Sequence, residues 1–549
     1  MGSILAKVSF GGRMKAPNPH ATARKETTVI IPQPFQPVNW LRQAVGAAWQ
    51  VIAQPQSVPV EPPSPSAIRL VRPNLCQLAQ PEADLPRFVA DCAVARKYLD
   101  LLGPLDWTNF PERDPHRPWP GPTPAPRAPF VAAFLVKLHE GKVYMSNLRD
   151  YLVEHPALVW VLGFPLKPAA QFSWGFDVEA SLPTARHFGR VLRTLPNDAL
   201  QFLLDSTVYW LRQELPAEVG FGQAISLDTK HILAWVKENN PKAYVLESDR
   251  LDKSRQPKGD HDCKLGCKKK RNASTAEAVV ETGPAEPATP TQNPRSVTNF
   301  SASDVYYWGY GSGVVATKVP DWGEFVLAEL TQTFDRADPT YFFPLMTQVE
   351  RRLGFKPPFG AFDAAFDPFY VFEYFDQAGG FAAVPLTERG GIHRTFNETG
   401  LPLCQAGLAM PLKATFICHT TAVEHQRGRY ACPLLFPQIT SQPCPIAHKN
   451  WPKGGCLTTM ATSIGARLRY QLDRDSNEFK SIYQQRTATE RINSQATEIG
   501  IERPKLRNQS AITNQDTLIY VLINLRGLKR VRARKAELAA QTEATLNRT

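Results

Sequence analysis

The sequence predicts a mixed α/β fold preceded by a helical domain. Over residues 84–216, apolar side chains recur at three- and four-residue spacing, the pattern of amphipathic helices. From 217 to 387, β-branched and aromatic runs come first, and helix-like and strand-like segments then alternate. Such an order is typical of a sheet flanked by helices. With 549 residues, the chain is long enough for about two to four domains.

The α/β region 217–387 contains most of the expected strands. They are expected at 220–235, 305–319, 323–331, 358–366 and 380–387, with helices at 340–355 and 367–380. Asp367 is expected to open the second helix as its cap. An insert at about 250–300, basic and then low in complexity, is predicted to be disordered. The region 1–83, with its Pro-rich stretch, is predicted to be poorly ordered.

Three further parts follow the alternating region. Residues 388–470 are rich in Cys and His and are expected to form an insertion. Residues 471–510 contain a polar-faced helix, and residues 511–549 an apolar helix with a basic tail. The run "LRGLKRVRARK" in that tail suits non-specific DNA contact or a solvated helix face, and the sequence leaves both open.

Composition narrows the function classes. Lys and Arg outnumber Asp and Glu by 63 to 51, and the net charge of +12 favours a polyanionic partner. Nine unevenly spread cysteines argue against a secreted disulfide framework. Neither a signal peptide nor an apolar run of about 18 residues is apparent. We therefore expect a soluble protein of a reducing, cytoplasmic compartment that does not insert into membranes.

The stretch "IYQQRTATERIN" (482–493) reads as a helix with three polar side chains on one face. At about 100° per residue, Tyr483, Arg486 and Glu490 lie close together. The opposite side is apolar and contains Ala488, Ile492, Ala496 and Ile499. One interpretation is a solvated face with a weak Arg–Glu pair. The other is a carboxylate held in an active site, which requires acidic partners elsewhere in the chain.

Two aspartates are candidates for these partners. Asp228 ends a strand candidate, and Asp363 lies in the apolar "FGAFDAAF", where an unpartnered carboxylate is costly to bury. Together with Glu490 they form a set of oxygen ligands suited to a pair of Mg²⁺ ions acting on a phosphodiester. Each also has a plainer interpretation. Asp228 suits a turn after a strand, Asp363 competes with Asp367, and Glu490 suits an exposed surface.

The order of "SLDTKH", "GAFDAAFD" and "YQQRTATER" resembles that in bacterial insertion-sequence transposases of the DDE type. The spacing of Tyr483, Arg486 and Glu490 is similar to the Y-x2-R-x3-E signature of one large group of them. "YMSNLRDYLVEHPALVWVLGFP" resembles their N-terminal helical domain, and the resemblance covers roughly residues 84–530. Two positions depart from it. Thr497 stands where the group often has a lysine, and "YYWGYGSG" lacks the lysine that often follows its Gly-Tyr pair.

The resemblance implies an RNase H-like mixed sheet flanked by helices, with a β-rich insertion before the glutamate helix. It implies that Asp228, Asp363 and Glu490 bind two Mg²⁺ or Mn²⁺ ions. Arginine offers a bidentate fork to phosphate, and other cations near the acids suit the same partner. The expected DNA contacts are Tyr483, Arg486, Arg491, Lys230 and Lys505.

The activity implied by the resemblance is that of a DNA transposase. Such an enzyme binds the terminal inverted repeats of its element, cuts the phosphodiester and joins the 3′-hydroxyl to target DNA. The helical domain would bind ends or pair subunits, and a homodimer is expected because two ends must be cut. Two alternatives stay open: a catalytically inactive, DNA-binding descendant, and an RNase H-like nuclease without strand transfer.

The cysteines of the insertion are candidates for a structural Zn²⁺ site, with Cys404, Cys432, Cys444 and Cys456 as the preferred set. A small insertion with little core would gain stability from a metal. The segment contains no C-x2-C pair, so free structural thiols are the alternative. A weaker zinc candidate is "HDCKLGC" (261–267).

Overall fold

The computed structural model describes residues 85–114, 119–121, 124–244, 247–268, 305–386, 394–419 and 423–546. All of them belong to the compact unit Pro63–Thr549. The region 1–83 lies outside the described residues, as do residues 269–304 of the predicted insert. No described helix is both long enough and apolar enough to cross a membrane.

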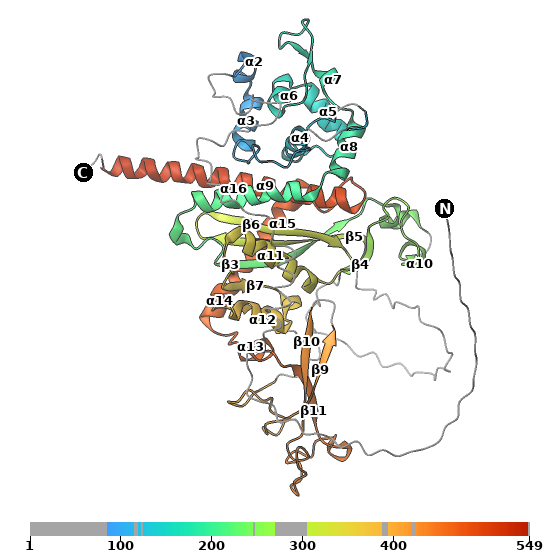
Figure 1. Ribbon diagram of the computed structural model, residues 1–549, viewed down its shortest axis with the longest axis vertical. Coiled ribbons are helices and arrows are strands. Elements are labelled where there is room, and N and C mark those ends of the chain that lie inside the picture. The colour runs from blue at the N-terminus through green and yellow to red at the C-terminus, as the bar shows by residue number, and fades with distance from the viewer. Residues whose placement is uncertain are drawn as a thin grey trace, which may run out of the picture. The chain divides into compact units, whose positions relative to one another are not determined.

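A six-stranded mixed sheet organises the fold (Figure 1). Its strands are β3 (Ala224–Leu233), β4 (Lys264–Lys268), β5 (Val305–Val319), β6 (Gly323–Thr333), β7 (Phe359–Ala361) and β8 (Phe381–Ala383). Their order is β4-β5-β3-β7-β8, with β6 also paired to β5. The strand β5 runs antiparallel to β3, β4 and β6, whereas β7 runs parallel to β3 and to β8. The predicted mixed α/β class is confirmed, and β4 falls inside the segment predicted to be disordered.

Apolar side chains of the sheet alternate between its two faces, and each face is covered. On β5, Val314 belongs to one hydrophobic core and its neighbour Val315 to another. Helices α15 (Thr487–Ile499) and α16 (Gln509–Leu546) contribute to the first core. Helices α11 (Phe342–Leu353) and α12 (Phe369–Asp376) contribute to the second. Burial on both faces explains why β5 and β6 read as long apolar runs.

The helical region shares the core of the α15–α16 face. Its helices are α2 (Arg87–Ala90), α3 (Ala93–Leu102), α4 (Arg127–His139), α5 (Met145–Val153), α6 (Pro156–Leu162), α7 (Val178–Ser181), α8 (Ala185–Thr194) and α9 (Asn197–Glu214). A short hairpin of β1 (Lys167–Pro168) and β2 (Phe176–Asp177) interrupts them. Phe134 of α4, Leu203 of α9 and Ile519 of α16 lie in one continuous cluster. In Figure 1, α9 runs alongside α16, so this pair of helices connects the helical region to the sheet.

The insertion predicted before the glutamate helix contains a separate antiparallel sheet. Its strands, in the order β11-β10-β9, are β9 (Leu412–His419), β10 (Glu424–Ala431) and β11 (Leu457–Ala461). Only a small core supports it, with Met410, Tyr430 and Met460 among its buried members. The chain then returns to the main sheet through α13 (Gly465–Gln471), which packs against α12.

The polar-faced segment is helical, but it is not one uniform helix. α14 (Asn477–Tyr483) ends at Tyr483, and a 3₁₀ turn, η10 (Gln484–Arg486), leads into α15. Ala488, Ile492 and Ala496 are fully buried, as the spacing predicted. This apolar back packs α15 onto the sheet and places its first turn beside β3.

Candidate active site

The parallel pairing of β3 with β7 brings two predicted aspartates to neighbouring positions. Ser226 of β3 pairs with Ala361 of β7. Asp228 and Asp363 each lie two residues beyond these partners. Because paired parallel strands advance together, the two carboxyl groups reach the same edge of the sheet. Asp228 itself lies in the middle of β3, not at its end as the sequence suggested.

Asp363 lies just beyond its strand and caps a short turn. β7 ends at Ala361, and the Asp363 side chain accepts a 2.9 Å hydrogen bond from the Ala365 N–H at the start of η8 (Ala364–Phe366). The expected strand 358–366 is therefore shorter than predicted. Asp367, the expected cap of α12, instead pairs with Arg469, whose Nε donates to Oδ1 at 2.7 Å.

Asp228 is in an unfavourable place for a negative charge. Burial raises its pKa to about 6 from the ordinary 3.8. The nearby carboxylates of Asp363 and Asp338 raise this pKa further, while the Thr229 backbone N–H and Arg486 lower it. A second cation in contact with Asp228 would therefore stabilise its ionised form.

Asp338 is a third acid at this edge that the sequence analysis did not single out. It opens the 3₁₀ turn η7 (Asp338–Tyr341), and its Oδ1 accepts a 2.8 Å hydrogen bond from Thr229 Oγ1. Burial raises its pKa, and Asp363 adds to that effect. Asp228, Asp338 and Asp363 thus form an acidic cluster whose members influence one another electrostatically.

Arg486 connects Glu490 electrostatically to this cluster. Arg486 Nη2 lies 3.3 Å from Glu490 Oε1, and Arg486 Nη1 lies 3.5 Å from the Tyr483 hydroxyl. Burial opposes the charge of Arg486, but Tyr483, Glu490 and Asp228 outweigh it and raise the Arg486 pKa. The predicted face of Tyr483, Arg486 and Glu490 therefore exists, although the Glu490 side chain is 49% exposed.

Asn493, one turn after Glu490, makes the direct contact between α15 and the acids. Its Nδ2 donates a 3.0 Å hydrogen bond to Asp228 Oδ2. Its Oδ1 is buried and has no hydrogen-bond partner among the described residues. Asn493 is not among the residues predicted for the site, although its position three residues after Glu490 puts it on a neighbouring part of the helix surface.

The donor chemistry suits a divalent cation, but the acids are not gathered around a common point. Within the described segments, no group of three or more His, Cys, Asp or Glu side chains is placed to hold a metal ion. Arg486 occupies one oxygen of Glu490, and Asn493 occupies one oxygen of Asp228. A metal site made of Asp228, Asp363 and Glu490 would require Glu490 to leave Arg486 and approach the aspartates.

The remaining predicted DNA contacts lie in different environments. Lys230 forms a 2.6 Å ion pair with Glu502, and Arg491 pairs with Glu324 of β6. Lys505 is exposed, and its Nζ lies 5.7 Å from the centroid of the Trp235 ring. Of these three, only Lys505 has no acidic partner among the residues described.

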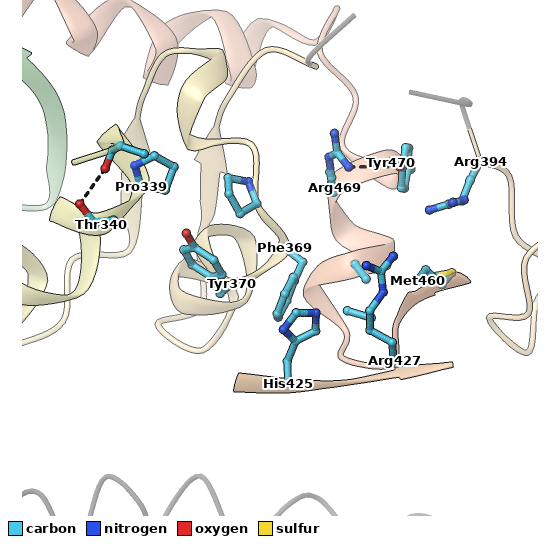
Figure 2. A pocket seen from close by; sticks show the side chains of 14 residues that line it. Pro339, Thr340, Phe369, Tyr370, Arg394, His425, Arg427, Met460, Arg469 and Tyr470 are labelled. Carbon is cyan, nitrogen blue, oxygen red and sulfur yellow. Dashed lines mark hydrogen bonds between the residues drawn. The ribbon is translucent and has the colours of Figure 1, made fainter. Parts of the chain in front are cut away.

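A pocket of about 380 Å³ lies where η7, α12 and α13 meet the strands of the insertion (Figure 2). One wall is η7, which begins at Asp338, and the other walls come from α12, α13 and the insertion strands. Its lining combines aromatic rings with cations: Phe369, Tyr370, Tyr470, His425, Arg394, Arg427 and Arg469. Figure 2 shows the rings of Phe369 and His425 close together, with centroids 4.8 Å apart.

Two of the three pocket arginines have no acidic partner among the described side chains. Arg394 Nη2 donates to Thr458 Oγ1 at 3.1 Å and to the Thr459 carbonyl at 3.2 Å. Arg427 Nη2 donates to the same carbonyl at 3.3 Å, and its buried Nε has no partner. Only Arg469 is neutralised, by Asp367. The pocket is therefore cationic and suits an anionic ligand with a flat ring.

Three of the four predicted zinc ligands interact with one another. Burial raises the pKa of the Cys456 thiol to about 12, and Cys432 and Cys404 contribute to the rise. The described cysteines form no disulfide. Because no described metal-holding group is present here either, zinc stays a prediction and the free thiols remain its alternative.

Half of the six cations in the basic run on α16 form ion pairs with acids elsewhere in the described chain. Arg532 and Lys535 both bind Glu214 of α9, at 2.9 and 2.8 Å, and Lys529 pairs with Asp100 of α3. These ion pairs attach α16 to the helical region. They leave less unneutralised charge for DNA than the run "LRGLKRVRARK" suggested.

Neither the protein-family models nor the curated protein sequences searched contain a match to this chain.

Proposed function

We propose that the chain is a DNA transposase of the DDE type, with an RNase H-like catalytic domain. The observation that carries the proposal is the register of β3 and β7, which brings Asp228 of β3 close to Asp363, just beyond the end of β7. Glu490, the third acid of the resemblance, lies on α15, which contacts β3 and binds Asp228 through Asn493.

Strand order supports the RNase H-like part of the proposal. Without β4, the chain order of the strands is β3, β5, β6, β7 and β8, and their order across the sheet is β6-β5-β3-β7-β8. β5 runs antiparallel to its neighbours β3 and β6, whereas β7 and β8 run parallel to β3. This is the arrangement expected of an RNase H-like sheet.

In this proposal Asp228, Asp363 and Glu490 hold divalent cations. Such ions activate an attacking hydroxyl group and stabilise the leaving oxygen of a phosphodiester. The protein side chains position the reactants. Asn493 orients the Asp228 carboxylate, and Arg486 presents a guanidinium fork toward phosphate once Glu490 is released.

The cationic pocket supports a polyanionic substrate at this site. Arg394 and Arg427, which have no acidic partner in the described part of the chain, bring two positive charges to a cavity that shares η7 with the acids. Since each cut element has two ends, we further propose that a homodimer acts on them.

The proposal is tested by assaying cleavage and strand transfer on DNA that contains the inverted repeats flanking the coding region. The parent protein should cut and join the DNA only with Mg²⁺ or Mn²⁺. Asp228→Ala, Asp363→Ala and Glu490→Ala should each abolish both steps while leaving DNA binding in place. Absence of cleavage by the correctly folded parent would overturn the proposal.

The two alternatives predict different results in the same assay. A nuclease would cut without joining. An inactive descendant would bind the DNA and do neither, an outcome favoured by the Arg486–Glu490 pair if that pair persists when DNA is bound.

A further inference from the structure

The segment that follows α15 presents a row of exposed cations. Arg503, Lys505 and Arg507 are exposed. Ile501, which precedes them, and Pro504, which lies between the first two, are buried. The segment is attached to the end of β3 by a 2.8 Å hydrogen bond from the Leu233 N–H to the Glu502 carbonyl. Every second side chain therefore faces solvent from a backbone that is fixed to the sheet.

Trp235 lies beneath two of these cations. The ring is 41% exposed, and it is one of few large aromatic side chains with such exposure among the described residues. Arg507 Cζ lies 4.9 Å and Lys505 Nζ 5.7 Å from the centroid of its ring. Contacts of this kind orient a cation without removing its charge.

The nearby acids are engaged elsewhere. Glu502 pairs with Lys230 at 2.6 Å. Asp260 accepts hydrogen bonds from the Tyr310 hydroxyl and the Asn508 N–H, and Asp262 accepts one from the Gln509 N–H. Arg503, Lys505 and Arg507 form no ion pair with any described acid, so the surface keeps three positive charges.

This surface lies within reach of a duplex held at the acids. Trp235 follows Asp228 by seven residues, which in extended chain is roughly 20 Å. Along one DNA strand this distance corresponds to about six base pairs. A duplex that has its scissile phosphate at Asp228 and follows the direction of β3 would reach the surface after about half a helical turn.

We propose that Trp235, Arg503, Lys505 and Arg507, here called the Trp235 strip, bind the sugar–phosphate backbone of duplex DNA. Lys505 and Arg507 contact phosphates, and Trp235 is a positioning residue that holds both cations against the DNA. The location about six base pairs from the cut bond rests on the proposed function. The binding of the duplex backbone itself does not.

The test uses the full chain and a fluorescein-labelled duplex of mixed sequence of about 40 base pairs, with affinity measured by anisotropy as salt is varied. Log affinity falls as log salt rises. For Lys505→Gln/Arg507→Gln, this negative slope should become shallower by about 2, because two phosphate contacts are lost. Lys449→Gln/Lys453→Gln, which removes the same charge from exposed positions in the insertion, should leave the slope unchanged.

Trp235 is tested by two replacements. Trp235→Ala should weaken binding and make the salt slope shallower. Trp235→Phe should keep most of the affinity and of the salt slope, because a ring remains for the cations. Equal thermal unfolding of the variants and the parent checks that the fold is intact. An unchanged slope in the Lys505/Arg507 variant overturns the proposal of the Trp235 strip. Tighter binding of the parent to polyglutamate, a polyanion without phosphates, than to DNA also overturns it.

Cleavage measured in parallel separates this inference from the proposed function. If the parent binds DNA through the strip but never cleaves it, the transposase proposal fails and the strip stands. If the parent cleaves, and the strip variants bind and cleave as the parent does, the strip fails and the transposase proposal stands.

Discussion

Arg486 connects Glu490 to the partly buried Asp228. Its Nη2 lies 3.3 Å from Glu490 Oε1, and its charge also lowers the pKa of Asp228, against the effect of burial. One guanidinium thus keeps the exposed acid in place and stabilises the ionised form of the buried one. Changing Arg486 is expected to alter both acids at once.

Arg486→Gln is expected to shift the acid limb of the cleavage rate to higher pH. Burial and the neighbouring acids raise the pKa of Asp228, whereas Arg486 lowers it. When the guanidinium is removed, this pKa therefore rises above about 6. A higher pH is then needed to ionise Asp228 for metal binding. Arg486→Lys keeps a positive charge and should keep the parent's profile. A Gln variant with an unshifted acid limb would contradict this coupling.

Asp228→Asn is expected to make the protein more stable at neutral pH and to remove its activity. The folded pKa of about 6 lies above the ordinary 3.8, so the fold favours the protonated acid. The stability contributed by this group is complete below about pH 4 and is lost as the pH rises through about 6. The shift corresponds to about 3 kcal/mol at neutral pH.

Urea unfolding of the parent and Asp228→Asn at about pH 4 and about pH 7.5 measures this difference. The advantage of the variant should appear only at the higher pH. Asp91→Asn, which changes an acid whose side chain is 71% exposed, should show no such dependence. A variant that is less stable than the parent at both pH values would refute the assignment.

Asn493→Ala is expected to lower cleavage about 10- to 100-fold, the usual cost of losing a side chain that orients a metal ligand. The Asp228 carboxylate loses its 3.0 Å hydrogen bond, so more Mg²⁺ should be needed for half-maximal rate. Ser494→Ala, at the exposed neighbouring position of α15, serves as the control. A lower rate with an unchanged Mg²⁺ requirement would indicate a purely structural role for Asn493.

The sequence predicts local features of this site well and its assembly poorly. The buried back of α15 follows from a spacing within one helix, and Ala488, Ile492 and Ala496 are buried as expected. The neighbourhood of Asp228 and Asp363 depends on the register of two strands that are far apart in the chain. No local pattern encodes that register, so the pairing was suggested only by the chemistry that the three acids share and by the resemblance to a family.

The missed residues show the same limit. Asp338 begins a turn with Pro339 after it, a common helix-start signal that says nothing about active sites. Its closeness to the cluster arises from the hydrogen bond to Thr229, which only packing reveals. Arg394 and Arg427 of the pocket meet η7 through the docking of the insertion, which no spacing in the sequence indicates.

Arg427→Gln is expected to weaken binding of DNA at the acids, because the pocket loses a guanidinium whose buried Nε has no partner among the described residues. A charge-assisted contact to phosphate contributes about 1.5–3 kcal/mol, which corresponds to roughly 10- to 150-fold in affinity. Arg429→Gln is the matched control, since Arg429 lies two residues away on β10, is exposed, and does not line the pocket. Affinity for an inverted-repeat duplex, measured in Ca²⁺ to hold back cleavage, should fall for Arg427→Gln alone. Equal losses in both variants would show that the overall charge of the insertion matters and not this pocket.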